Sequence, residues 1–211
     1  MPSAPFRTIL VVSLALAVLS LLASPAVTQV GLSSYRDFSF PNTTGRGSAQ
    51  LQARVFYPAS GSSYSAPLIA RPGGYPVVVF LHGFGLLGSA YGLLGSELSS
   101  RGYVVVLSDT ALTSGPRQVS DGLALYPALA AANAQTSNFL EGALDMGRAG
   151  LCGHSMGGGG IFGVLASNPG YVAGLAISPM FPGSAVMGAV EVPVGVVHGE
   201  GDVVNPWRVH G

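Results

Sequence analysis

The chain has 211 residues, of which 48% are hydrophobic, and it contains 31 glycines and 15 prolines. This composition suits one compact domain with a substantial core and excludes a disordered chain. Only 9% of the residues are charged, all nine basic residues are arginine, and the formal net charge is zero. Because nucleic acids and anionic membranes require a basic surface, both are excluded as partners, and a neutral or apolar partner is favoured.

The first 26 residues have the pattern of a secretory signal peptide. Arg7 precedes a predominantly apolar run without charges, 9–23, and small residues follow at Ser24 and Ala26. The run is shorter than the ~20 residues that a membrane-spanning helix needs, so we expect no stable membrane anchoring. The prediction is export to the extracellular space or periplasm, with cleavage near Ala26 and a single domain over residues 27–211.

Cys152 is the only cysteine, so an internal disulfide is excluded. We expect it to be a buried apolar thiol.

The first predicted elements lead into a buried sheet. Alternating polar and apolar residues over 50–57 predict a half-buried strand, and the apolar run 77–81 predicts a strand buried on both faces. A helix is expected over 89–101, with Tyr91, Leu94 and Leu98 on one face. A second buried strand is expected over 103–109.

The second half continues the alternation of strands and helices. A helix interrupted or begun by Pro127 is expected within 120–140, and another that begins at Met156 and stops at 168–170. Strands are expected at 148–153, 172–177 and 192–197. This spacing predicts an α/β fold with a mostly parallel sheet, helices on both faces and an antiparallel pair at its start.

The candidate catalytic segment is Gly153-His154-Ser155-Met156-Gly157, which lies between a predicted strand and a predicted helix. Small residues at both flanks let the chain turn abruptly, so Ser155 would stand at the tip of a nucleophile elbow. The N–H of Met156 would open the following helix and point to where an oxyanion forms.

A phosphate cradle, one rival interpretation of this glycine cluster, is excluded by the residue types. A phosphate-binding P-loop requires a lysine before its Ser or Thr, and the chain has no lysine. A glycine-rich packing turn with an incidental serine is the structural alternative.

The motif "GHSMGGGG" and the segment "FLHGFG…RGYVVVLSDT" resemble secreted α/β-hydrolases of the dienelactone-hydrolase-like group, which contains bacterial cutinases and polyester (PET) hydrolases. The resemblance covers about Tyr35 to Pro206. The chain also resembles chlorophyllases, but more weakly. Those enzymes typically have arginine at the position of Met156, and this difference favours the cutinase-like group.

The resemblance implies roles for particular residues. Phe84 and Met156 would supply the backbone N–H groups of an oxyanion hole, and the Phe84 ring would wall the acyl pocket. His154 would line the substrate cleft, whereas His82 would support its loop.

The triad acid is expected at Asp202, where the resemblance places the carboxylate that orients the catalytic imidazole. Glu200 and Asp109 are weaker candidates, expected to be solvated loop charges, and His198 is expected to pack against or cap the loop.

The sequence after Asp202 lacks a histidine at the position where the triad base is expected. In this fold the order is Ser, Asp, His, and His210 is the only histidine after Asp202. Eight residues leave no room for a further strand, helix and returning loop. We therefore expect an α/β-hydrolase domain incomplete at its C-terminus, without its last strand and helix, and nearly inactive as written.

The predicted function is that of a serine carboxylic ester hydrolase that acts on a small or polymeric ester through an acyl-enzyme, without metal or organic cofactor. The alternative is a non-catalytic module with a hydrolase-like fold that binds an apolar ligand or polymer surface.

Overall fold

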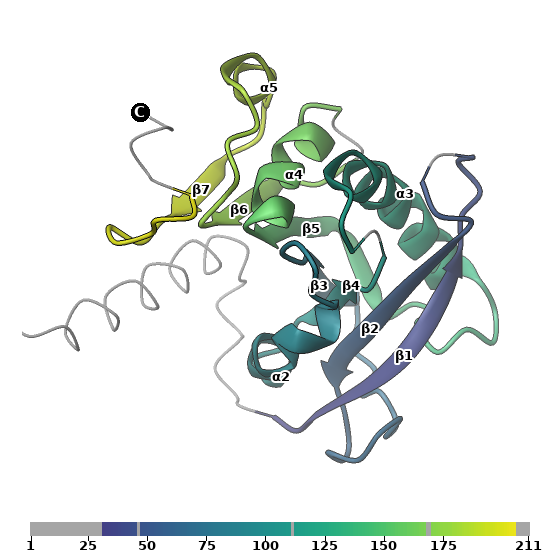
Figure 1. The fold of residues 1–211 in the computed structure, drawn as a ribbon. Helices are drawn as coiled ribbons and strands as arrows, with labels where there is room; N and C mark the ends of the chain where they lie inside the picture. Colours follow the sequence, from purple (N-terminus) through teal and green to yellow (C-terminus); the bar gives the residue numbers. More distant parts are fainter. Residues whose placement is uncertain (1–30, 46, 111, 168–169, 206–211) are drawn as a thin grey trace, which may run out of the picture.

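The computed structural model describes residues 31–45, 47–110, 112–167 and 170–205. The predicted signal peptide and His210 lie outside these residues. The described chain forms one seven-stranded sheet with the strand order β1-β2-β4-β3-β5-β6-β7 (Figure 1). The strands are β1 Ser33–Pro41, β2 Gln50–Pro58, β3 Tyr75–Leu81, β4 Val104–Ser108, β5 Leu144–His154, β6 Ala173–Ile177 and β7 Val194–Val197.

The sheet is mostly parallel. β1 pairs antiparallel with β2, and β2 pairs antiparallel with β4. The pairs β4–β3, β3–β5, β5–β6 and β6–β7 are all parallel. The predicted sheet, with its antiparallel start, is confirmed.

Helices cover both faces of the sheet (Figure 1). The helical elements are the short 3₁₀ helix η1 Gly88–Tyr91, followed by α2 Gly92–Ser100, α3 Gly115–Ala134, α4 Met156–Leu165 and α5 Ser184–Gly188. α2 packs on one face with a cluster that includes Phe56, Phe80 and Leu98. α3 and α4 pack on the opposite face, so the fold has three layers.

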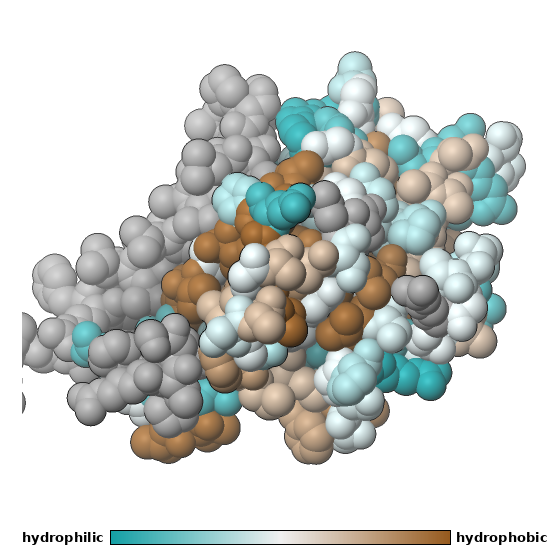
Figure 2. Space-filling model, turned by 90° about the horizontal axis from the view of Figure 1, so that it is seen from above, coloured by the Kyte–Doolittle hydropathy of each residue, from teal (hydrophilic) through white to brown (hydrophobic). Residues whose placement is uncertain are grey.

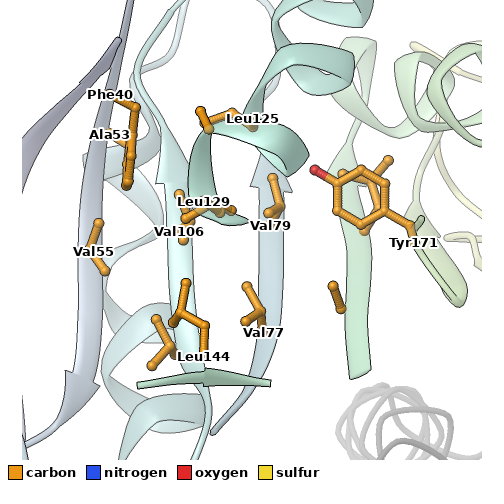
Figure 3. Close-up of a cluster of buried hydrophobic side chains, with 14 of the residues drawn as sticks. Phe40, Ala53, Val55, Val77, Val79, Val106, Leu125, Leu129, Leu144 and Tyr171 are labelled. Atoms are coloured by element: carbon orange, nitrogen blue, oxygen red, sulfur yellow. The ribbon is translucent and has the colours of Figure 1, made fainter. Parts of the chain in front are cut away.

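The larger core lies between the sheet and the helices α3 and α4. Leu125 and Leu129 of α3 lie against Val79 and Val106 of the central strands (Figure 3). All four side chains are fully buried. Burying an aliphatic side chain of this size contributes about 1.5–3 kcal/mol, so this cluster fixes how α3 lies on the sheet.

Several boundaries differ from the sequence prediction. The helix expected from Ser89 is a 3₁₀ turn that becomes α-helical only at Gly92. The helix expected within 120–140 begins earlier, at Gly115, with the Ser114 hydroxyl accepting from the Arg117 N–H, and it continues through Pro127. The strand expected at 148–153 begins at Leu144 and contains an irregularity in its pairing with β3.

The parallel strands deliver their carboxyl ends to one edge of the sheet. β3 ends at Leu81, β5 at His154 and β6 at Ile177. The loops after these strands are therefore neighbours, which is where open α/β sheets carry their ligand sites. In the part of the chain that the structure describes, no helix is long and apolar enough to cross a membrane.

Candidate active site

Ser155 forms the sharp turn between β5 and α4. Its backbone has φ 53° and ψ −115°, a conformation with positive φ that residues other than glycine rarely adopt. Three hydrogen bonds of 2.9 Å hold it: its N–H donates to the Ile177 carbonyl, and its carbonyl accepts from the N–H groups of Gly159 and Met180. The main chain is thus fixed on both sides, with the hydroxyl at the tip of the turn.

Glycine is required around this turn because other backbone passes close to it. A Cβ at Gly157 would lie 2.6 Å from the His82 carbonyl oxygen, and one at Gly153 would lie 2.8 Å from the Gly158 nitrogen. These approaches are shorter than a side-chain carbon tolerates, so the glycines allow β3, β5 and α4 to meet here.

The loop after β3 carries His82 and Phe84. His82 is fully buried, with Nδ1 2.8 Å from the Gly83 carbonyl oxygen and Nε2 2.7 Å from the Thr110 carbonyl oxygen. Both ring nitrogens are therefore engaged with the backbone. Phe84 has 65% of its surface exposed, and Gly85 anchors the loop by donating to Leu112 at 2.7 Å.

His154 is held by Tyr91, which lies 63 positions earlier in the chain. Tyr91 Oη lies 2.8 Å from His154 Nδ1 and accepts from the Gly83 N–H at 3.1 Å. Burial lowers the pKa of His154, and the carboxylate of Asp202 opposes that shift. The tyrosine therefore links the turn at His154 and Ser155 to the loop after β3.

Asp202 lies in the loop after β7, and its carboxylate is fixed by the backbone. Its Oδ1 accepts from the N–H groups of Val204 and Asn205, each at 2.9 Å. These hydrogen bonds hold the pKa of Asp202 below its ordinary value, and the bond from the Asn205 N–H has the largest effect. The group therefore stays ionised at neutral pH.

Asn205 connects this loop to Ser155. Its Nδ2 donates to Ser155 Oγ at 3.4 Å and to the Ser178 carbonyl at 3.1 Å. The sequence analysis missed this residue because no motif marks it and the contact spans 50 positions.

The two weaker acid candidates have different surroundings from Asp202. Asp109 Oδ1 accepts from the Ser89 N–H at 3.2 Å at the start of η1, and Glu200 is exposed in the loop after β7. His198 follows β7 directly, with Nδ1 3.4 Å from the Gly199 carbonyl oxygen. Cys152 is buried in β5, and burial raises the pKa of its thiol to about 12.

An apolar pocket of about 280 Å³ adjoins the elbow. Met156, the first residue of α4, lines it together with Met180, Phe181 and Val186. Two of the residues that line this pocket, Met180 and Phe181, are exposed. Figure 2 shows hydrophobic side chains exposed among hydrophilic ones on one face of the molecule. A larger pocket, of about 370 Å³, lies around Tyr57 and Phe139, and none of the predicted site residues lines it.

The structure brings the predicted residues to one edge of the sheet in two groups. Asp202 reaches Ser155 through Asn205, and His154 meets the loop of Phe84 through Tyr91 and Gly83. Met156 follows Ser155 and is 4% exposed. Among the described residues, no three His, Cys, Asp or Glu side chains gather closely enough to hold a metal ion.

The sharp turn at Ser155 at the end of a parallel central strand, with α4 after it and the loop of Asp202 after β7, is the arrangement of an α/β-hydrolase fold. The chain belongs to the PETase family: residues 31–211 match the family model, which is described as PET hydrolase-like.

Curated relatives agree with this assignment. A bis(hydroxyethyl) terephthalate hydrolase of Streptomyces coelicolor is 33% identical over 156 residues, which are 74% of this chain and 46% of that protein. Cutinase 1 of Thermobifida cellulosilytica is 25% identical over 156 residues, 74% of this chain and 55% of the cutinase. Chlorophyllase-2 of Arabidopsis thaliana is 30% identical over 131 residues, 58% of this chain and 41% of that enzyme.

The chain spans about half the length of the curated relatives that it matches. The similarity to cutinases and to a terephthalate ester hydrolase indicates an ester hydrolase as the general class.

Proposed function

We propose that this chain carries the nucleophile and the acid of a secreted serine carboxylic ester hydrolase, whose substrate is an ester with an apolar acyl or alcohol part. The observation that carries the proposal is the conformation of Ser155. A serine at positive φ, fixed through its backbone N–H and carbonyl and followed by a buried helix start, is the arrangement that exposes a nucleophile.

In the proposed reaction Ser155 Oγ attacks the ester carbonyl carbon while a histidine base takes its proton. The backbone N–H groups of Phe84 and Met156 stabilise the oxyanion, and the alcohol leaves with a proton returned by the base. Water then attacks the acyl-enzyme in the same way and releases the acid. The ionised carboxylate of Asp202 orients the imidazole.

In this proposal, the histidine that acts as the base lies outside the described residues. Within them, the only side-chain partner of Ser155 Oγ is Asn205 Nδ2. His82 has both ring nitrogens beside backbone carbonyls, and His154 Nδ1 is engaged with Tyr91. The terephthalate ester and cutin activities named for the relatives suggest aromatic or aliphatic ester substrates for this chain, and the apolar pocket beside Met156 suits either.

The test uses the complete translated reading frame that contains this chain, expressed without residues 1–26. Hydrolysis of p-nitrophenyl butyrate is compared between the wild type and Ser155→Ala. Loss of turnover by roughly 10⁶ supports the proposal, because that is the effect of removing a triad serine. A folded wild type that binds an apolar polymer surface but hydrolyses no ester supports the non-catalytic module instead.

A further inference from the structure

The contact between Tyr91 and His154 also determines which of the two groups donates the hydrogen bond. The Gly83 amide can only donate, so Tyr91 Oη is the acceptor of that 3.1 Å bond. The tyrosine hydroxyl has one proton left to give. Among the described residues, the only acceptor within its reach is His154 Nδ1, at 2.8 Å.

This donor order fixes the protonation of the imidazole. If Tyr91 donates to Nδ1, that nitrogen has no proton, and a neutral ring must carry its proton on Nε2. Burial raises the pKa of Tyr91 and lowers that of His154, which keeps the hydroxyl protonated and the ring neutral at pH 7.

The packing around the pair leaves the ring little freedom. A Cβ at Gly83 would lie 3.0 Å from His154 Nδ1 and 3.2 Å from Tyr91 Oη, so the loop backbone is in contact with both groups. The Tyr91 ring packs against Phe80 with centroids 4.5 Å apart, and His154 lies at a centroid distance of 5.9 Å from Tyr91. Tyr91 is therefore a fixed donor rather than a mobile surface hydroxyl.

We propose that Tyr91 is a positioning residue that holds His154 as its Nε2–H tautomer, so that the ring, which directly precedes Ser155 in the chain, offers a hydrogen-bond donor to a second carbonyl oxygen of a diester substrate. The half-buried His154 is adjacent to the nucleophile, and its Nε2 has no hydrogen-bond partner in the described part of the chain. The inference rests on the proposed ester hydrolysis. It adds a preference for substrates with an acceptor beyond the scissile ester.

The first test is spectroscopic and does not depend on activity. Long-range ¹H–¹⁵N correlation of the imidazoles in the complete protein reports which nitrogen of His154 is protonated, and the His154→Phe spectrum assigns the signals. The expected result is the Nε2–H tautomer in the wild type and a mixture of tautomers in Tyr91→Phe. A wild-type ring protonated on Nδ1, or an unchanged ring in Tyr91→Phe, would overturn the inference.

The second test is kinetic and compares diethyl terephthalate with ethyl p-butylbenzoate, which lacks the second carbonyl. Tyr91→Phe is expected to lower kcat/KM for the diester about 3- to 10-fold more than for the monoester, the effect of one neutral hydrogen bond. His154→Phe should reduce the discrimination similarly, and the double variant should add little.

Tyr75→Phe is the matched control, because its hydroxyl donates to the Ile69 carbonyl at 3.0 Å, and neither Ser155 nor His154 is a partner of it. It should leave both the tautomer and the discrimination unchanged. Equal losses on the two esters in Tyr91→Phe would overturn the proposed donor, whereas a wild type that hydrolyses neither ester would instead refute the proposed function.

Discussion

Ser155 donates its backbone N–H to the carbonyl of Ile177 at 2.9 Å, which joins the turn between β5 and α4 to the end of the neighbouring strand β6. The positive φ of Ser155 costs on the order of 1–3 kcal/mol, so the surrounding contacts must hold it. The close approach of Gly157 to Leu81 and His82, where β3 ends, is one of those contacts.

Gly157→Ala should destabilise the protein because its methyl group would collide with the carbonyl oxygens of Leu81 and His82. We expect a loss of about 3 kcal/mol, which lowers Tm by about 6–12 °C for a chain of this size. Thermal unfolding followed by circular dichroism measures this. Gly188→Ala in α5, where nothing lies within 4 Å of the added carbon, should leave Tm nearly unchanged; equal shifts in both variants would contradict the packing argument.

Asp202→Asn should lower esterase turnover by about 10⁴ with little effect on stability. The asparagine oxygen can still accept the two backbone N–H groups that Asp202 Oδ1 accepts, so the loop should persist while the negative charge is lost. The measurement is kcat of the complete protein together with its Tm. Glu200→Gln, in the same loop, is the control, and a comparable loss of kcat there would argue against Asp202 as the triad acid.

Stability should fall as the pH drops below about 6.5, the ordinary pKa of histidine, partly through His154. Burial lowers its pKa in the folded state. The unfolded chain therefore binds a proton at a pH where the folded chain does not, and acid favours unfolding. Tm at pH 7.5 and pH 5.5 should differ less in His154→Gln than in the wild type. An identical difference in the two proteins would show that His154 does not titrate in this way.

Cys152 should resist alkylation in the native protein. Its thiol is buried in β5 and has a pKa of about 12, so almost no thiolate is present at pH 8. Iodoacetamide followed by intact-mass measurement should show modification only in denaturant. Rapid labelling of the folded protein would mean that β5 opens near Ser155.

The central strands and the sharp turn between β5 and α4 could be predicted from sequence because their signals are local. The run 77–81 is apolar without interruption, as a strand buried on both faces requires, and the residue types from Gly153 to Gly157 are those that a strand-to-helix turn demands. Burial of Tyr75–Leu81 in β3 agrees with that prediction.

Other elements could not be predicted because their signals are weak or non-local. β1 mixes polar and charged residues with aromatic ones, and this blurs the alternation of a strand at the sheet edge. α5 has only five residues, too few for a helical period. The contacts of Asn205 with Ser155 and of Tyr91 with His154 arise only when loops from different strands meet at one edge of the sheet.

The most direct test of the account is covalent labelling of Ser155 by a fluorophosphonate probe, followed by peptide mapping of the product of the complete reading frame. The account predicts one adduct per protein, on the peptide that contains Ser155, and no adduct in Ser155→Ala. A folded wild type that forms no adduct, or an adduct that persists in Ser155→Ala, would contradict the assignment of Ser155 as the nucleophile.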